Sequence, residues 1–336
     1  MFTLISINNS QNLFYSVESS NHELLLPLVQ EENICLPLPI NVVSKYWNIH
    51  LPIEEALAQS KQYPPGTGSV LIEGIELAER NGLVCKMHHS SLAELKKIID
   101  NGIPPIVILP GIPEITQHAS VISGYDDTEK TILHYIQKGN QEGEQQEGAI
   151  PQKIFDKEWS EDGRILIILA PEDTISSLDI GEKSNEESNR LCFISEKLNL
   201  QKNASEALES LKKAVEIENH NSTALHLLGG LLNAQNSEEC IQYYQKSIDL
   251  NDRYFLSYNG LGNFYLKSNQ FEKAESCYTK AIEINPKRSA KIYKNRAYLR
   301  EKQKKNSKAK EDLKSYLKFA PKAQDRGIIE QAIREL

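Results

Sequence analysis

The sequence lacks any apolar run that approaches the roughly 18 residues of a membrane-spanning helix. Its first 15 residues also lack a basic segment followed by a clean apolar run, so no secretory signal is expected. The five cysteines are scattered and form no Cys-x-x-Cys pair, which argues against a disulfide framework and against a zinc site. We therefore expect a cytoplasmic protein with no membrane span, no metal and no other cofactor.

Positive charge is scarce in one half of the chain and abundant in the other. Residues 1–187 contain 12 Lys and Arg against 28 Asp and Glu, whereas residues 188–336 contain 26 against 18. The 336 residues together carry a net charge of −8, so a nucleic acid is not an expected partner. The asymmetry predicts instead that the acidic N-terminal part and the basic C-terminal part attract each other, or attract different partners.

The C-terminal half has an internal period of 34 residues, counted from Phe255. Large side chains, small side chains and a proline recur where a pair of helices would pack: Tyr258, Leu261, Gly262, Tyr265, Ala274, Tyr278, Ala281 and Pro286. This pattern resembles the tetratricopeptide repeat. Weaker units in phase begin near Ser188, Ser222 and Ala290, which predicts about four stacked units over 188–336, closed by a capping helix over 323–336.

Arrays of this kind present a concave groove to their ligands, lined by the first helix of each unit. At the expected lining positions the sequence has Asn259, Asn263, Lys291, Lys294 and Asn295. Such residues resemble part of a clamp for the terminal carboxylate of a peptide, and a solvated helix face is the alternative interpretation. Because residues 287–326 hold 15 basic residues against 4 acidic ones, an acidic protein or peptide segment is the expected partner.

Residues 1–171 are predicted to form an α+β domain, because predicted helices precede a group of mostly antiparallel strands. Helices are expected over 37–47, 53–59, 66–82 and from the capping residue Ser91, and strands from Cys85 and over 103–111, 118–127, 131–136 and 164–171. The acidic segment 141–148 is expected to be a flexible loop, and 172–187 an acidic linker.

One cysteine and one histidine in this domain are notable for where they stand. Cys35 lies where an extended segment turns into a helix, and a helix N-terminus lowers the pKa of a thiol. His118 begins a predicted strand that leads into the segment GYDD. A cysteine at the start of a helix with a histidine on a distant strand is the arrangement of a papain-like thiol hydrolase.

Residues 22–172 resemble the papain-like cysteine peptidases of the bacteriocin-processing type, which cleave double-glycine leader peptides, in the branch that carries a C-terminal tetratricopeptide array. The resemblance rests on Gln30 five residues before Cys35, on Pro37, on the stretch HASVISGYDD, and on the aromatic pair near residues 155–159. It implies that Cys35 is the nucleophile, that His118 is the general base, and that the Gln30 amide donates to the oxyanion.

Two departures from that family pattern leave two functions open. Leu36 stands where the family has glycine, and Tyr135 stands near the place of the orienting Asp, with His134 beside it. The sequence therefore predicts a cysteine peptidase whose repeats recruit a substrate or a partner. The alternative is an inactive peptidase-like domain in a protein that serves as a peptide-binding adaptor through its repeats.

Overall fold

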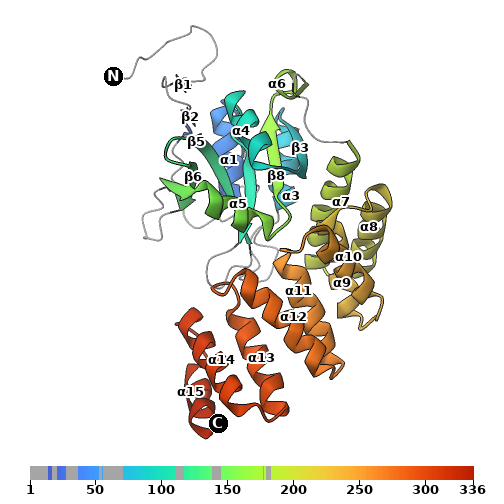
Figure 1. The fold of residues 1–336 in the computed structure, drawn as a ribbon. Helices are drawn as coiled ribbons and strands as arrows, with labels where there is room; N and C mark the ends of the chain where they lie inside the picture. The colour runs from blue at the N-terminus through green and yellow to red at the C-terminus, as the bar shows by residue number, and fades with distance from the viewer. Residues whose placement is uncertain are drawn as a thin grey trace. The chain divides into compact units, whose positions relative to one another are not determined.

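The structure is a computed structural model, and it describes residues 14–16, 21–27, 37–52, 55, 71–110, 117–137, 145–176, 178 and 183–336. These residues form two compact units (Figure 1). The first unit holds the described parts of Met1–Leu109, His118–Trp159 and Arg164–Asn219, and the second holds those of Pro110–Gln117, Ser160–Gly163 and His220–Leu336. Gln30, Cys35 and Leu36 lie outside the described residues.

A sheet of eight strands organises the N-terminal part of the chain. The strands are β1 (Phe14–Ser16), β2 (Asn21–Leu24), β3 (Val84–His89), β4 (Ile106–Pro110), β5 (Gln117–Asp126), β6 (Thr131–Gln137), β7 (Gln145–Pro151) and β8 (Ile165–Ala170). They are ordered β1-β2-β5-β4-β8-β3, with β6 paired to β5 and β7 paired to β6. Both β3 and β4 run antiparallel to β8, and β6 runs antiparallel to β5 and β7.

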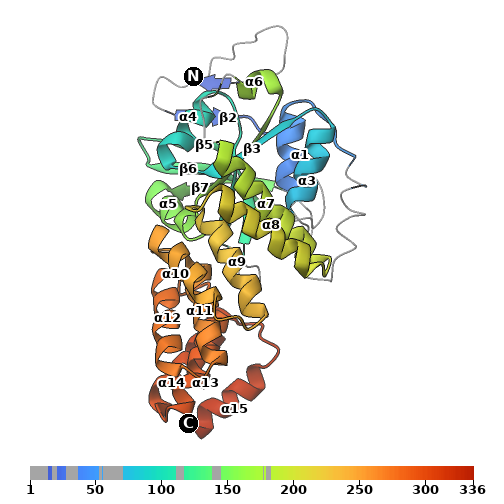
Figure 2. The same ribbon diagram turned by 90° about the vertical axis from the view of Figure 1, so that its right-hand side faces the viewer.

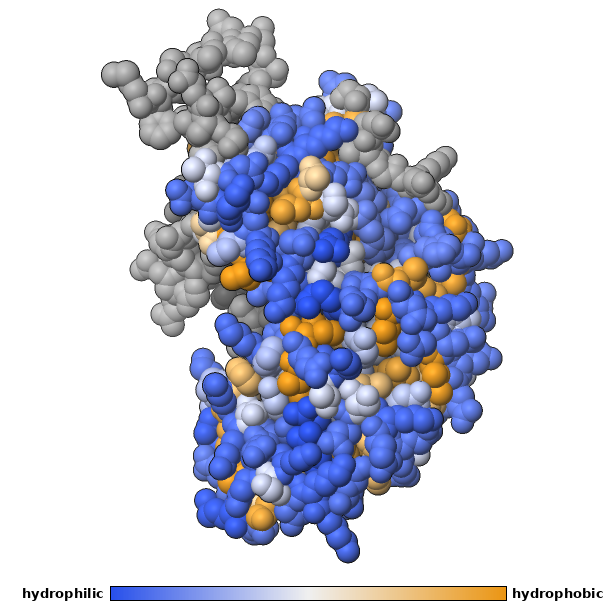
Figure 3. Space-filling view, in the orientation of Figure 1, coloured by the Kyte–Doolittle hydropathy of each residue, from blue (hydrophilic) through white to orange (hydrophobic). Residues whose placement is uncertain are grey.

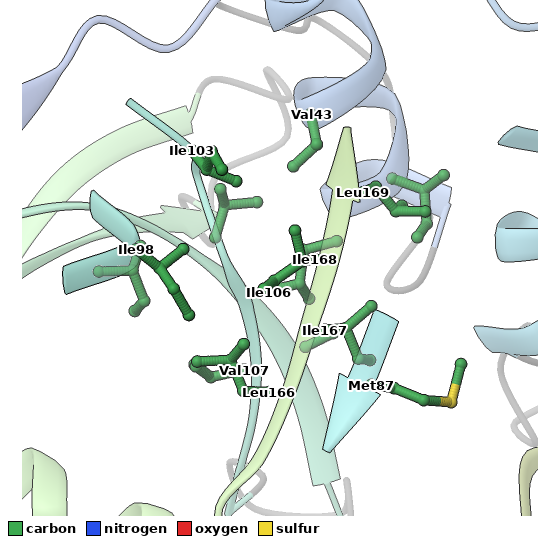
Figure 4. Packing of buried hydrophobic residues seen from close by; sticks show 14 of the residues in the cluster. Val43, Met87, Ile98, Ile103, Ile106, Val107, Leu166, Ile167, Ile168 and Leu169 are labelled. Atoms are coloured by element: carbon green, nitrogen blue, oxygen red, sulfur yellow. The ribbon is translucent and has the colours of Figure 1, made fainter. Parts of the chain in front are cut away.

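Several helices accompany this sheet. They are α1 (Pro37–Tyr46), α3 (Leu71–Arg80), α4 (Leu92–Asp100), α5 (Gln152–Ser160), α6 (Glu172–Ser176), α7 (Lys183–Leu200) and α8 (Ala204–Ile217). Helix α1 packs on β8 and α3, whereas α3 and α7 both contact β3. All six residues of β8 are buried because elements cover both of its faces, and its side chains meet those of β4, α1 and α4 in one hydrophobic cluster (Figure 4).

The start of α4 follows its sequence signal. Ser91 has extended backbone, and its hydroxyl accepts a hydrogen bond of 3.2 Å from the backbone N–H of Glu94, as an N-cap residue does. The Glu94 carboxylate turns to the preceding strand, where it accepts from Ser90 Oγ at 2.7 Å and contacts His88 Nε2 at 3.1 Å. The cap therefore also ties α4 to β3.

Two stretches differ from what the sequence predicts. The predicted loop 141–148 is strand β7 in its described part, because residues 145–151 pair along the whole length of β6. This ladder is made by backbone groups, and the polar sequence QQEGAIP has no apolar alternation that would reveal it. Within the predicted linker 172–187, α6 is helical from Glu172 to Ser176 and α7 begins at Lys183.

Side chains of α7 bond to other elements of the first unit. Arg190 makes two hydrogen bonds to the Glu79 carboxylate, at 2.8 and 2.5 Å, and Lys197 Nζ lies 3.0 Å from Glu76 Oε2. Asn189 Nδ2 also donates to the Met87 carbonyl at 3.4 Å. These contacts place cations of the first repeat-like helix against acidic groups of α3, within one compact unit.

Successive helix pairs make up the C-terminal part, and Figure 2 shows their stacking. The helices are α9 (Ser222–Ala234), α10 (Cys240–Leu250), α11 (Phe255–Lys267), α12 (Phe271–Ile284), α13 (Ala290–Lys302), α14 (Asn306–Phe319) and α15 (Arg326–Glu335). Gly262 allows close approach, because a Cβ at this position would lie 2.7 Å from the Tyr278 ring. The predicted helix pairs and the helix within 323–336 are therefore present.

Polar side chains also join the two helices of a pair. Asp312 is buried and accepts from Arg296 at 2.8 and 3.0 Å and from Arg300 at 2.8 Å, which links α13 to α14. The outer surface is different in character. On the face seen in Figure 3, the last helices are mostly hydrophilic, in keeping with the excess of lysine in this part of the chain.

Candidate functional site

His118 lies at the start of β5 with a half-buried side chain. The predicted partners of His118, Cys35 and Gln30, lie outside the described residues, so their assembly into a catalytic site stays a prediction. The neighbouring strand β6 carries His134, which is only 7% exposed and sits opposite Ile122 of β5. Two imidazoles therefore occupy adjoining strands.

The hydrogen bonds around His134 determine its tautomer. Ser120 Oγ donates its single proton to the Tyr135 carbonyl at 3.1 Å, and it lies 3.0 Å from His134 Nδ1. Because that proton is already used, His134 Nδ1–H must donate to Ser120 Oγ. Burial, together with the charge of His118, lowers the pKa of His134 to about 4. At neutral pH His134 is therefore an uncharged imidazole whose Nε2 is an acceptor.

The described thiols are unsuited to nucleophilic chemistry. Cys85, Cys192 and Cys240 are buried and Cys277 is half-buried. Burial raises the pKa of Cys240 and of Cys277 to about 11, and raises those of Cys85 and Cys192 as well. Each of these thiols stays protonated at neutral pH and packs as a small apolar group.

Three of the predicted lining residues form a connected set, which we call the amide ladder: Asn259, Asn263 and Asn295. Asn263 Oδ1 accepts from Tyr278 Oη at 2.7 Å and from Asn295 Nδ2 at 3.2 Å, and Asn263 Nδ2 reaches Asn259 Oδ1 at 3.5 Å. Since two donors already meet Asn263 Oδ1, the carboxamide is oriented with its NH₂ group away from Tyr278. The half-buried ladder thus has donor capacity that its internal bonds use weakly.

The two predicted lysines differ in their surroundings. Lys294 Nζ lies 2.6 Å from Asp325 Oδ2, over the ring of Tyr316, so its charge is already matched within the chain. The hydrogen bond from Lys294 lowers the pKa of Asp325. Lys291 is exposed and makes no ion pair with any residue that the structure describes. It lies one helical turn before Asn295, which puts its ammonium on the side of α13 that carries the ladder.

Sequence reasoning missed a polar cluster around the turn Ser160–Gly163, which belongs to the second unit. Glu161 and Asp162 are each 1% exposed, and they contact side chains from the turns that follow α10 and α12. The sequence carried a signal for the repeat residues of this cluster but not for the turn. Asn251 and Asn285, which both bond to the turn, are separated by one 34-residue repeat.

The part of the chain that the structure describes gives no support for a membrane-spanning helix or for a metal site. In those residues there is no helix both long and apolar enough to cross a bilayer. The same residues contain no group of three His, Cys, Asp or Glu side chains arranged to hold a metal ion.

Comparison with protein families confirms the repeat that the sequence predicts from Phe255. Residues 255–288 match the tetratricopeptide repeat model, and the start and length agree with the predicted unit. The C-terminal part of the chain therefore contains a tetratricopeptide repeat within a helical array. The match does not extend to the N-terminal sheet, whose papain-like character stays a prediction.

Individual proteins resemble only parts of the chain. Anaphase-promoting complex subunit 3 of Schizosaccharomyces pombe is 29% identical over 102 residues, which are 30% of this chain and 15% of that protein. A solved structure of PilF from Pseudomonas aeruginosa is 19% identical, covers 46% of this chain and 72% of its own, and has a TM-score of 0.42. MamA from Desulfovibrio magneticus RS-1 is 18% identical, covers 45% and 89%, and has a TM-score of 0.39.

Proposed function

We propose that this protein is an adaptor that binds a protein or peptide segment through its tetratricopeptide repeats. The observation that carries the proposal is the amide ladder, whose Asn263 carboxamide is held in one orientation by Tyr278 and Asn295. A side chain that is already ordered loses little conformational entropy when it binds a ligand. The repeats then act as a preformed surface for an extended segment.

The chemistry of the ladder favours a ligand that accepts hydrogen bonds. Asn263 offers N–H donors, and the nearby α13 face adds the ammonium of Lys291, which has no ion-pair partner among the described residues. Peptide carbonyls and carboxylates are the groups that accept from both. An acidic segment, or a free C-terminal carboxylate, is therefore the proposed ligand. Residues 287–326 contain 15 basic residues and 4 acidic ones, which also favours an acidic ligand.

Peptide binding by the full chain tests this function. The probe is a pool of fluorescein-labelled hexapeptides rich in Glu and Asp with free C-termini, and an amidated pool is the comparison. We expect saturable binding that is weaker for the amidated pool. Asn263→Ala and Lys291→Ala should each weaken binding by about tenfold, as loss of a hydrogen bond to a charged group does. Lys308→Ala, an exposed lysine of α14, is the matched control and should bind normally. Equal binding by Asn263→Ala and the unaltered chain would refute the proposed surface.

A second candidate function is cysteine-dependent amide hydrolysis in the N-terminal unit. The observation in its favour is the placement of His118 at the start of β5, with the neutral imidazole of His134 on the adjoining strand β6. In this interpretation His118 serves Cys35 as general base, and Gln30 supports the oxyanion. Labelling of the Cys35 thiol tests it, as set out below.

A further inference from the structure

The turn Ser160–Gly163 is held by two consecutive inter-repeat turns. From the turn between α10 and α11, Asn251 Nδ2 donates to the Ser160 carbonyl at 2.7 Å and Arg253 Nε donates to Ser160 Oγ at 3.0 Å. The Phe255 backbone N–H, at the start of α11, donates to the Glu161 carbonyl at 3.2 Å. The first inter-repeat turn thus forms hydrogen bonds with both the backbone and the serine side chain of Ser160–Gly163.

The second inter-repeat turn meets the two carboxylates. Asn285 Nδ2 donates to Glu161 Oε2 at 2.9 Å, and Arg288 Nη2 donates to Asp162 Oδ1 at 3.0 Å. Arg288 Nη1 also lies 3.8 Å from Glu161 Oε2, and Arg253 Nη2 lies 3.4 Å from Glu161 Oε1. The guanidinium of Arg288 stacks over the Phe255 ring at 4.6 Å.

Two of the residues that bond to the turn recur with the period of the repeat. Asn251 and Asn285 are 34 residues apart, and both end a helix with nearly the same backbone angles, φ −145° and ψ 96° against φ −146° and ψ 93°. Two consecutive helix pairs therefore present equivalent carboxamides at equivalent places. The turn that they hold comes from 91 to 126 residues earlier in the chain and has no counterpart in the repeat.

Burying two adjacent carboxylates is unfavourable unless cations and donors replace the lost water. Here two guanidinium groups and a carboxamide contact the two carboxylates, and a second carboxamide and a backbone N–H hold the carbonyls of the turn. Cations and amide donors gathered around two adjacent carboxylates are the composition of a recognition site for an acidic segment. The segment seated on it belongs to the same chain.

We propose that Asn251, Arg253, Asn285 and Arg288 form a binding site for an acidic turn, and that Ser160–Gly163 occupies it as a built-in competitor of acidic partner segments. This acidic-turn site is separate from the amide ladder, so neither proposal depends on the other. A covalently attached competitor acts at an effective concentration in the millimolar range, which blocks weaker external ligands. Weakening the internal turn should therefore reveal binding by an external one.

The experiment uses a fluorescein-labelled peptide of residues 157–164 and a matched peptide in which Gln replaces Glu161 and Asn replaces Asp162. The Glu161→Gln/Asp162→Asn variant of the full chain keeps the shape of the turn and removes its charges. We expect this variant to bind the acidic peptide at least about tenfold more tightly than the unaltered chain does. Adding Arg288→Ala should abolish that binding, whereas Lys287→Ala, an exposed neighbour, should leave it unchanged. The matched peptide, which lacks these two carboxylates, should not bind.

Hydrogen exchange on the unaltered chain provides a test that requires no variant to fold. Saturating acidic peptide should speed exchange at residues 160–163 while residues 251–255 stay protected, because one acidic segment replaces the other. Two results would overturn the proposal: a folded charge-removed variant that binds no peptide, or binding that survives Arg288→Ala. Unchanged exchange at residues 160–163 under excess peptide would overturn it as well, and the turn would then be a structural strut only.

Discussion

Asn295 Nδ2 donates a hydrogen bond of 3.2 Å to Oδ1 of Asn263, which lies 32 residues earlier in the chain. The bond joins α13 to α11, the first helices of consecutive repeats. It passes beside Tyr278 Oη, which comes from the second helix of the earlier repeat and donates to the same oxygen at 2.7 Å. One carboxamide is thus set by three helices, and this makes the ladder a rigid surface.

The spacing of the two helices within a pair predicts opposite effects for two glycine substitutions. In a helix interior Gly→Ala usually stabilises by about 1 kcal/mol. At Gly262 the new Cβ would lie 2.7 Å from the Tyr278 ring, so we expect Gly262→Ala to destabilise by about 1 to 3 kcal/mol. At Gly230 the nearest atom is Tyr244 Oη at 3.9 Å, so Gly230→Ala should be neutral or stabilising. Urea unfolding followed by circular dichroism measures both, and equal effects would contradict the packing described.

The buried Glu161 predicts a pH dependence of stability. Burial raises the pKa of Glu161 to about 7 despite the opposing hydrogen bond from Asn285 and the charge of Arg288. Between its ordinary value of 4.5 and about 7, the folded chain holds this proton and the unfolded chain does not. The free energy of unfolding should therefore fall as pH rises through this range, by up to about 3 kcal/mol from this group.

Comparing the unaltered chain with the Glu161→Gln variant isolates this effect. Chemical unfolding at pH 5 and at pH 8 would be measured for both chains, and the loss of stability between the two pH values should be smaller in the variant. Glu196 also has a pKa raised by burial to about 7, but it is present in both chains and drops out of the difference. Parallel pH curves for the two chains would show that Glu161 does not titrate as described.

The hydrogen bonds of Ser120 predict the protonation of His134. Its pKa of about 4 means that the imidazole resists protonation, so this group stabilises the fold less as pH falls from 6.5 towards 4. Nitrogen chemical shifts of ¹⁵N-labelled histidine should show His134 neutral and protonated on Nδ1 at pH 6. Ser120→Ala removes the acceptor of that proton, and the Nε2–H form should then appear. An Nε2–H form in the unaltered chain would disagree with the structure.

The Cys35 thiol provides the test of hydrolase chemistry. A thiolate paired with His118 would react with iodoacetamide at neutral pH faster than an ordinary cysteine does. In that case Cys35→Ala removes the fast-labelled site, and His118→Ala slows its labelling by about tenfold or more. Cys277, which is half-buried with a raised pKa, is the internal control for slow labelling. Equal labelling rates of Cys35 in the unaltered chain and in His118→Ala would contradict hydrolase chemistry. The adaptor would then be the one proposed function that is left.

Local signals predicted a large share of the fold. Ser91 and Glu94 marked the start of α4, because a side chain that caps a helix acts over three residues. Strand β7 carried no such signal, since its pairing depends on the backbone of β6 rather than on its own side chains. The salt bridge of Arg190 with Glu79 was equally invisible, because it joins residues 111 positions apart.

The candidate sites divide in the same way. Asn259, Asn263 and Asn295 could be placed on the same side of the first helices of two repeats, because repeat position determines the direction of a side chain. The pairing of Lys294 with Asp325 could not, since it depends on where α15 folds back on α13. In the structure Lys294 makes an internal ion pair, and its role in ligand binding stays a prediction.

By itself, the sequence determined the 34-residue helix pairs, since their small and large side chains recur at positions that pack within each pair or against the next one. Only the tertiary structure decided that Glu161 and Asp162 are buried against Asn285 and Arg288. The physical reason is that two carboxylates in a polar turn look like solvated surface until folding places donors around them. Distances along the chain of 124 and 126 residues hide that outcome from any local pattern.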